Sequence, residues 1–220
     1  MKDELEKLLN ELSCAYEKSD IKNNKYCIEN KRKWGFELIQ SALLENKPMI
    51  IGFNWGVDKT WKKYINGDEY NNQLSIQKRS ILKIEMGSLQ RSVNMCKKHF
   101  PSIDFTDGSH SNFCFFRSEM ENQISYHDID LCKGIFLRML EIVNPSVVFI
   151  FSSKARKYML ANKLIQNVKE KKIYGKHKRS NSFTVARGCL SNGANAFFLP
   201  HPNSRISKEI RNEAWKFCAS

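Results

Sequence analysis

The sequence contains no run of about 20 apolar residues, so we expect no helix that crosses a membrane. It contains neither a GxGxxG nor a GxxxxGK loop, so no phosphate-binding motif favours a nucleotide hydrolase. Internal repeats and low-complexity linkers are also missing. The N-terminal stretch MKDELEKLLNEL is acidic and amphipathic, unlike a signal peptide. We therefore expect a single cytoplasmic domain over residues 1–220.

The seven cysteines include no CxxC pair and follow neither zinc nor iron–sulfur spacing. An odd, scattered set of cysteines is typical of free thiols in a reducing compartment. We therefore expect no metal and no cofactor.

Acidic residues are too few to balance the basic ones, since 36 Lys and Arg face 23 Asp and Glu, for a net charge of +13. This excess predicts a polyanionic partner, although charge alone does not separate nucleic acid from an anionic membrane. The basic stretch KEKKIYGKHKRS, residues 169–180, suits contact with a DNA backbone. A solvated helix end followed by a loop is the alternative interpretation of this stretch.

Helical and strand patterns alternate along the chain. Apolar spacing predicts helices over residues 2–18, 36–46, 76–100, 128–144, 154–172 and 207–218. Apolar runs predict strands within residues 48–54, 103–116 and 145–153, and a strand pair at 182–190 and 195–202. Asp128 or Asp130 is the expected cap of the helix at 128–144. This alternation predicts a mainly parallel sheet between helices, with an N-terminal helical part at 1–46 and an α/β core at 47–220.

Ligands of such sheets bind beyond the carboxyl ends of the strands, and the first candidate end is GFNWGVD, residues 52–58. Gly52 and Gly56 would let the backbone approach a ligand closely. Asn54 offers a carboxamide, and Asp58 is either a general base or a cap. An ordinary strand-to-loop turn is the alternative.

Two further strand ends carry polar residues. In NFCFFRS, Asn112 could read the edge of a planar heterocycle, or it could satisfy a backbone group beside core phenylalanines. In LPHPNSRISKE, prolines on both sides of His201 restrict its backbone. A neutral imidazole there could donate a hydrogen bond to a leaving group.

These segments, in this order, resemble the uracil-DNA glycosylase superfamily. GFNWG resembles the GINPG or GMNPG box of the mismatch-specific and single-strand-selective branches, and NFCFFRS resembles the strand with the pyrimidine-reading asparagine. VNPSVVFIFSSKA resembles the core strand and helix start, and HPNSR resembles the HPSPR loop that wedges into the duplex. The likeness covers residues 47–211, with Trp55 in place of proline and a longer, charged segment at 57–111.

The resemblance implies a three-layer α/β/α sandwich with a central, mainly parallel four-stranded sheet. It also implies a monofunctional DNA glycosylase, which flips a pyrimidine out of DNA and hydrolyses its N-glycosidic bond, leaving an abasic site. A box centred on asparagine favours a 5-substituted pyrimidine, such as the glucosylated hydroxymethylcytosine of phage DNA, over uracil. The implied partner is single- or double-stranded DNA, with no membrane and no obligatory protein partner, in base excision or antiviral defence.

The resemblance also assigns roles to individual residues. The catalytic candidates are Asn54, which would position the attacking water, His201, which would stabilise the leaving base, and Asp58. The base-binding candidates are Gly52, Phe53, Trp55, Asn112, Phe113 and Tyr64, with Trp61 as a further stacking residue. The DNA-binding candidates are Ser204, Arg205, Lys208, Lys176, Lys178 and Arg179, with Arg205 as the wedge and the backbone amides around Ser204 as phosphate donors.

Two other functions stay open at this point. A non-catalytic DNA-binding module on the same fold would bind DNA without releasing a base. An α/β nucleotide or nucleoside hydrolase would use the same strand ends to act on monomers.

Overall fold

The computed structural model describes residues 2–29, 34–39, 41–56, 87–105, 107–175 and 182–220. The helices are α1 (Lys2–Glu17), α2 (Lys25–Glu29), α3 (Gly87–His99), α4 (Tyr126–Val143), α5 (Ser153–Ala161) and α6 (Lys208–Ala219). The strands are β1 (Met49–Gly52), β2 (Trp55–Gly56), β3 (Ser109–Asn112), β4 (Arg117–Ser118), β5 (Val147–Ile150), β6 (Gln166–Tyr174), β7 (Ser182–Cys189) and β8 (Asn195–Phe198).

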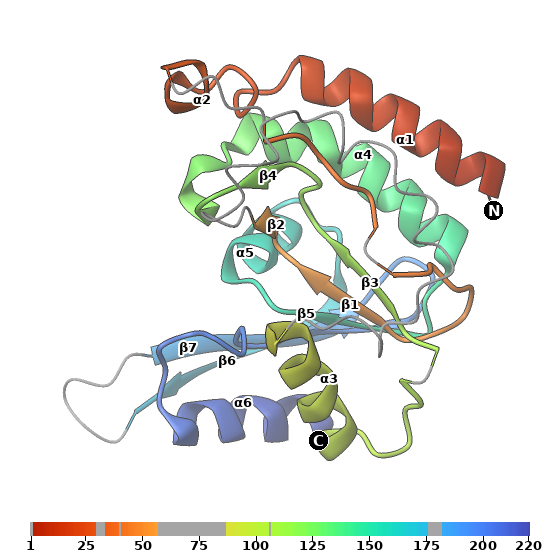
Figure 1. Ribbon diagram of the computed structural model, residues 1–220. Coiled ribbons are helices and arrows are strands. Elements are labelled where there is room, and N and C mark those ends of the chain that lie inside the picture. The colour runs from red at the N-terminus through yellow and green to blue at the C-terminus, as the bar shows by residue number, and fades with distance from the viewer. Residues whose placement is uncertain (1, 30–33, 40, 57–86, 106, 176–181) are drawn as a thin grey trace.

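The central sheet has six strands in the order β3-β1-β5-β8-β7-β6 (Figure 1). The first four strands run parallel, and β7 and β6 continue the sheet in antiparallel pairs. The expectation of a mainly parallel sheet is thus confirmed. The expected number of four strands is wrong, because β6 and β7 add a hairpin at one edge. β2 and β4 form a separate parallel pair.

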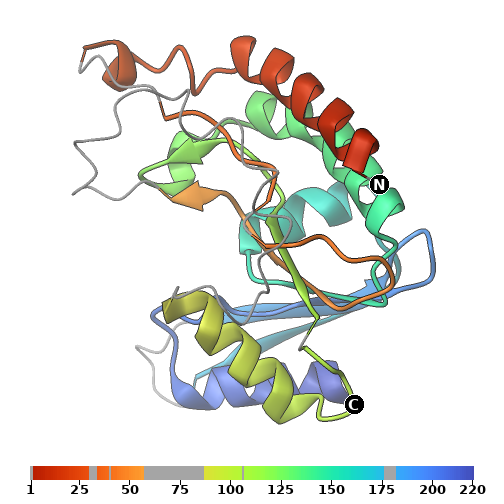
Figure 2. The same ribbon diagram turned by 45° about the vertical axis from the view of Figure 1, so that its right-hand side comes forward.

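Helices cover both faces of the sheet. α4 and α5 lie on one face, with α1 outside α4, and α3 and α6 lie on the other face (Figures 1 and 2). One core joins the sheet to α1 and α4 through residues such as Leu8, Ile51 and Phe136. The second core joins it to α3 and α6 through residues such as Val93 and Trp215. None of the helices described is both long and apolar enough to cross a bilayer.

The predicted helix over residues 154–172 is wrong in its second half. α5 ends at Ala161, where Lys163 takes a left-handed backbone conformation with φ of 55°, and β6 begins at Gln166. The lysine-rich stretch favours a helix by intrinsic propensity. Pairing with β7 along the whole of β6 overrides that preference, because the hairpin satisfies the backbone of both strands.

The predicted helix over residues 36–46 is also wrong. The described residues of this segment form no helix and lie beside β3, where the Glu37 N–H donates to the Phe115 carbonyl at 2.9 Å and the Ser41 hydroxyl accepts from the His110 N–H at 2.7 Å. Successive residues are buried here, including Glu37, whereas a surface helix buries only one face. The segment therefore closes the free edge of β3.

The helix α4 begins at a different cap from either residue expected. Ser125 is the N-cap, and Asp128 completes a capping box by accepting the Ser125 N–H at 2.9 Å. The other carboxylate oxygen of Asp128 accepts the backbone N–H groups of Asp20, at 2.8 Å, and Ile21, at 3.2 Å. Asp128 is fully buried, so one carboxylate joins the end of α1 to the start of α4.

Replacing Asp128 by alanine is expected to lower the free energy of unfolding by about 3 kcal/mol or more, because three backbone N–H groups lose their acceptor. Ser125→Ala removes one capping bond and should cost about 1 kcal/mol. Urea denaturation followed by circular dichroism measures both values. Equal losses in the two variants would contradict the joining role of Asp128.

Candidate functional site

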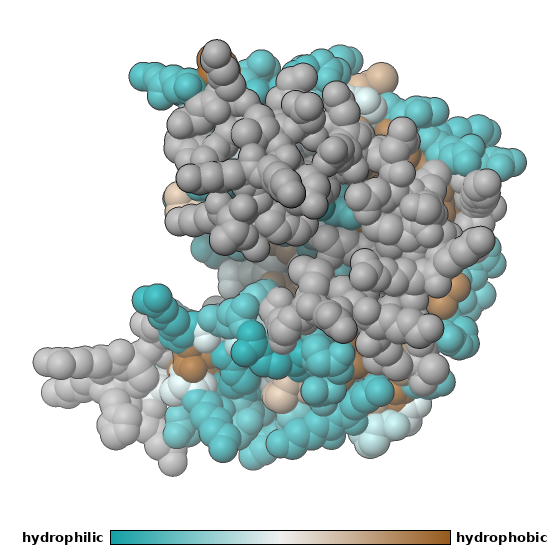
Figure 3. Space-filling model, in the orientation of Figure 1, coloured by the Kyte–Doolittle hydropathy of each residue, from teal (hydrophilic) through white to brown (hydrophobic). Residues whose placement is uncertain are grey.

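The four parallel strands end at one edge of the sheet, at Gly52, Asn112, Ile150 and Phe198. Beyond β1 and β3 the chain continues side by side as β2 and β4. A space-filling view shows a hollow in the surface on this side (Figure 3). The expectation that ligands bind beyond the carboxyl ends of the parallel strands thus leads to a concave part of the surface.

Asn54 and Asn112 follow neighbouring strands, whereas His201 follows β8, on the far side of β5. Adjacent strands lie about 4.8 Å apart, so β1 and β8 are separated by roughly 10 Å. All three side chains belong to the same edge of the sheet, with the two carboxamides at one end of it and the imidazole at the other.

Asn112 is a polar residue at this edge that makes no hydrogen bond to a described residue. The residue is 3% exposed, and its carboxamide has no hydrogen bond to any residue that the structure describes. Burying an amide without a partner costs about 1–3 kcal/mol. A Cβ on Gly52 would lie 2.1 Å from the Asn112 Oδ1, so only glycine at 52 leaves room for this carboxamide. The arrangement is typical of a group that binds a ligand.

His110 lies two residues before Asn112, on the same face of β3. Its ring is packed edge-to-face against Trp55, with 5.4 Å between ring centroids, and its Nδ1 is buried without a partner among the described residues. Burial lowers the pKa of His110 to about 4, so the ring is neutral at physiological pH. A second unsatisfied polar group thus lies beside the carboxamide.

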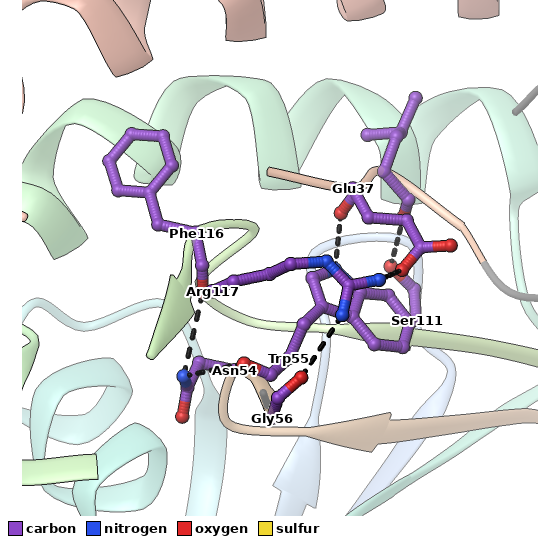
Figure 4. A network of polar contacts seen from close by, with 8 residues as sticks. Glu37, Asn54, Trp55, Gly56, Ser111, Phe116 and Arg117 are labelled. Carbon is purple, nitrogen blue, oxygen red and sulfur yellow. Dashed lines mark hydrogen bonds and ion pairs between the residues drawn. The ribbon is translucent and has the colours of Figure 1, made fainter. Parts of the chain in front are cut away.

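Asn54 is held by its amide nitrogen. The Nδ2 group donates to the Ser118 hydroxyl at 2.8 Å and to the carbonyls of Trp55, at 3.1 Å, and Phe116, at 3.5 Å. The Oδ1 atom points away from these partners (Figure 4) and receives no hydrogen bond from a described residue. Asn54 therefore presents a fixed acceptor, which suits a water molecule or an N–H group.

A buried ion pair between Glu37 and Arg117 supports the segment that carries Asn54 (Figure 4). The side chains of the pair are 4% and 5% exposed. Arg117 also donates to the Gly56 carbonyl at 3.0 Å, and the Trp55 indole donates to the Glu37 carbonyl. These contacts join the N-terminal segment to β2 and β4, and they fix the chain that follows Asn54.

His201 is oriented by its own loop. The Asn203 N–H donates to the His201 Nδ1 at 3.1 Å, which leaves the proton of the neutral ring on Nε2. Desolvation by the surrounding protein lowers the pKa of His201, and the positive charges of Arg211 and Arg91 lower it further. The His201 ring is thus neutral at physiological pH, with its proton on Nε2.

The loop amides do not serve as the phosphate donors that we expected. The Ser204 N–H and hydroxyl both bond to the His201 carbonyl, at 2.9 and 2.7 Å, and the Ile206 N–H bonds to the Ser204 carbonyl at 2.9 Å. Arg211 also donates to the Ser204 carbonyl at 3.0 Å. Because these groups close the turn on itself, the Ser204 N–H and hydroxyl are already hydrogen-bonded within the loop.

The other candidate residues are placed as follows. Arg205 and Lys208 are exposed beside this loop, and Arg91 of α3 contacts it through the Asn203 Oδ1 at 2.5 Å. Asp58, Trp61, Tyr64, Lys176, Lys178 and Arg179 lie outside the described residues. In the described ranges no cluster of three His, Cys, Asp or Glu side chains could hold a metal, and six cysteines are free.

The aromatic candidates belong to the core. Phe113 is completely buried and packs against Phe136 and Tyr158, with centroid distances of 4.9 and 5.5 Å. Trp55 is also buried, and the Phe53 ring is covered by the Lys154 ammonium, 5.0 Å from its centroid. None of the three presents an open ring face, so we leave them out of the proposed base contacts.

Neither a scan against protein-family models nor a search of curated proteins finds a match to this chain. The likeness to the uracil-DNA glycosylase superfamily therefore depends on the four short sequence boxes, and its consequences are treated below as a proposal.

The burial of His110 predicts a pH dependence of stability. The unfolded chain takes up a proton near pH 6.5 and the folded chain only near pH 4, so the folded state loses stability as the pH falls through this interval. The full loss is about 3 kcal/mol. Urea denaturation across this range should show a flatter dependence for His110→Phe, whereas His127→Gln, at an exposed histidine, should behave like the wild type. Identical profiles for all three proteins would contradict the buried, neutral state of His110.

Proposed function

We propose that this protein is a DNA glycosylase that hydrolyses the N-glycosidic bond of a flipped-out pyrimidine. The observation that carries the proposal is the buried Asn112 carboxamide, which has no partner in the described protein and lies over Gly52 at the carboxyl edge of the sheet. A carboxamide presents a donor and an acceptor side by side, which matches the polar edge of a pyrimidine. The α/β fold with helices on both faces is compatible with the superfamily that the sequence resembles.

The proposed reaction uses the two remaining polar groups at this edge. The Asn54 Oδ1 accepts a hydrogen bond from water and directs its oxygen to the C1′ atom of the sugar. The bond from C1′ to the base nitrogen breaks, its electron pair leaves with the base, and the water oxygen bonds to C1′. The His201 Nε2–H donates to the negative charge that develops on the base. The proton lost by the water passes through solvent to the departing base.

For the substrate we propose a modified pyrimidine in DNA, either 5-substituted or glucosylated as in phage hydroxymethylcytosine, ahead of uracil. The support is the resemblance of the box centred on Asn54 to branches that tolerate 5-substituents. An enzyme of this kind would act on foreign DNA in antiviral defence. Arg205, exposed beside the His201 loop, is the proposed wedge that fills the space left by the flipped base.

Incubation with oligonucleotides that contain uracil, hydroxymethylcytosine or glucosylated hydroxymethylcytosine tests the proposal. Free base and alkali-labile abasic sites are measured. Asn54→Ala and Asn112→Ala should each reduce base release by about 100-fold or more while DNA affinity is retained. The matched control is Asn195→Ala, at an exposed asparagine at the opposite, amino end of β8, which should release base at the wild-type rate.

The other outcomes separate the alternatives. DNA binding without base release from any of the three substrates would overturn the proposal in favour of a non-catalytic DNA-binding module. Hydrolysis of free nucleosides or nucleotides, but not of DNA, would favour a monomer hydrolase. Undiminished base release by Asn54→Ala would remove Asn54 from the reaction.

The charge around His201 predicts the pH profile of base release. Because the pKa of His201 is lowered, the neutral donor persists below pH 6.5, and the acidic limb of kcat/KM should lie below that value. Arg91→Gln removes one of the charges that lower this pKa and should move the acidic limb upward. Lys97→Gln, at the other end of α3, should not move it. An unchanged limb in Arg91→Gln would contradict this role of Arg91.

A further inference from the structure

The hairpin of β6 and β7 extends past the edge of the sheet at which the candidate site lies. β7 pairs with β8 only over Ala186 to Cys189, and Ala186 lies opposite Phe198, the last residue of β8. The preceding part of β7, from Ser182, pairs with β6 as far as Tyr174. This two-stranded part, here called the ribbon, therefore projects beyond the carboxyl ends of the parallel strands (Figure 1).

The ribbon carries positive charge that the described protein does not neutralise. Eight of the nine residues of β6 are exposed. Lys169, Lys171 and Lys172 have no acidic partner among the described residues, whereas Glu170, the single acidic residue of β6, pairs with Arg156 of α5. Unpaired ammonium groups on an exposed edge strand attract a polyanion.

The two faces of the ribbon differ. Ile173 is buried in the core that β7 shares with α6, so its neighbours in alternation, Lys172 and Tyr174, point to the opposite face. Glu170 has the same orientation and contacts α5. The face with Lys172 and Tyr174 is thus on the side of the sheet on which α5 lies.

This face combines an aromatic ring, a cation and hydroxyl groups. Tyr174 is 69% exposed, and the Lys172 ammonium lies 5.2 Å from the centroid of its ring. Ser182 and Thr184 lie opposite these two residues in the register. Exposed aromatic rings beside basic side chains bind unpaired nucleic-acid strands, because bases stack on the ring while the cations contact phosphates. A bilayer would require a broad apolar surface instead.

We propose that the ribbon is a binding surface for single-stranded DNA, with one base stacked on Tyr174 and a phosphate held by Lys172, while Lys169 and Lys171, on the other face of β6, add to the positive charge of this edge. The identity of the strand, as the one next to the flipped nucleotide, rests on the proposed function. The binding surface itself rests on the register, exposure and charge of β6 and β7.

Fluorescence anisotropy with labelled oligothymidylate, which contains no target base, tests the ribbon apart from any excision. Tyr174→Ala should weaken binding about 5- to 100-fold, and Tyr174→Phe should retain most of the affinity because the ring can still stack. Lys171→Glu with Lys172→Glu should also lower the slope of log affinity against log salt by about 0.7, the value for one phosphate contact on a single strand. The matched control is Lys97→Glu with Lys98→Glu, the same charge change in the last turn of α3.

Each failure has a distinct reading. Equal weakening by the two lysine pairs would overturn the ribbon in favour of net charge alone. Unchanged affinity in both the Tyr174→Ala and the Lys171/Lys172 variants would contradict the proposal. The lysines would then serve only to keep the exposed strand edge from pairing with another chain. If the ribbon binds DNA but no base is released, the ribbon proposal holds and the proposed glycosylase activity is wrong. If base is released but the ribbon variants bind DNA as the wild type does, the glycosylase proposal holds and the ribbon proposal is wrong. Circular dichroism of each variant checks that the fold is retained.

Discussion

The arrangement of the candidate site depends on one buried ion pair, between Glu37 and Arg117. Such a pair contributes little net stability, because both charges lose their water, but removing one partner leaves an uncompensated charge in the interior. Here the pair sits where three segments meet, and its members also hold Trp55 and Gly56. The pair therefore supports the chain next to Asn54, whose carboxamide is held by Ser118 and by the Trp55 and Phe116 carbonyls.

The site combines polar side chains that are hydrogen-bonded within the protein with polar side chains that have no hydrogen-bond partner among the described residues. Asn54 and His201 each have one end tied to the protein and the other end open. Asn112 is 3% exposed and makes no hydrogen bond to a described residue, and the His110 Nδ1 is buried without a partner among the described residues. Unsatisfied buried groups lower stability, and folded proteins retain few of them. Asn112 and His110 lie two residues apart on β3, at the strand edge of the candidate site.

Local patterns in the sequence predicted much of the fold. The strand within 145–153 and the helix at 207–218 are correct, because apolar runs and capping residues act over a few neighbours. The segments at 36–46 and 154–172 were misassigned, because their structure is decided by distant partners, the edge of β3 and the strand β7. Periodicity within a segment carries no information about such a partner.

The same limit applies to the site. The expectation that ligands bind beyond the strand ends led to Asn54, Asn112 and His201, but it gave no role to Glu37 or Arg117. One signal was available, since each charge lies within an aromatic or apolar run, Glu37 after Phe36 and Arg117 after Phe116. Opposite charges in two such runs indicate a buried pair, although the sequence does not reveal that the runs are neighbours.

The two outer margins of the sheet are unlike. The margin at β3 is sealed by the N-terminal segment, whereas the margin at β6 is open and lysine-rich. An open strand invites another copy of the chain to extend the sheet, but like charges on the two copies would repel each other. The lysines thus disfavour self-association through β6 and leave this margin accessible.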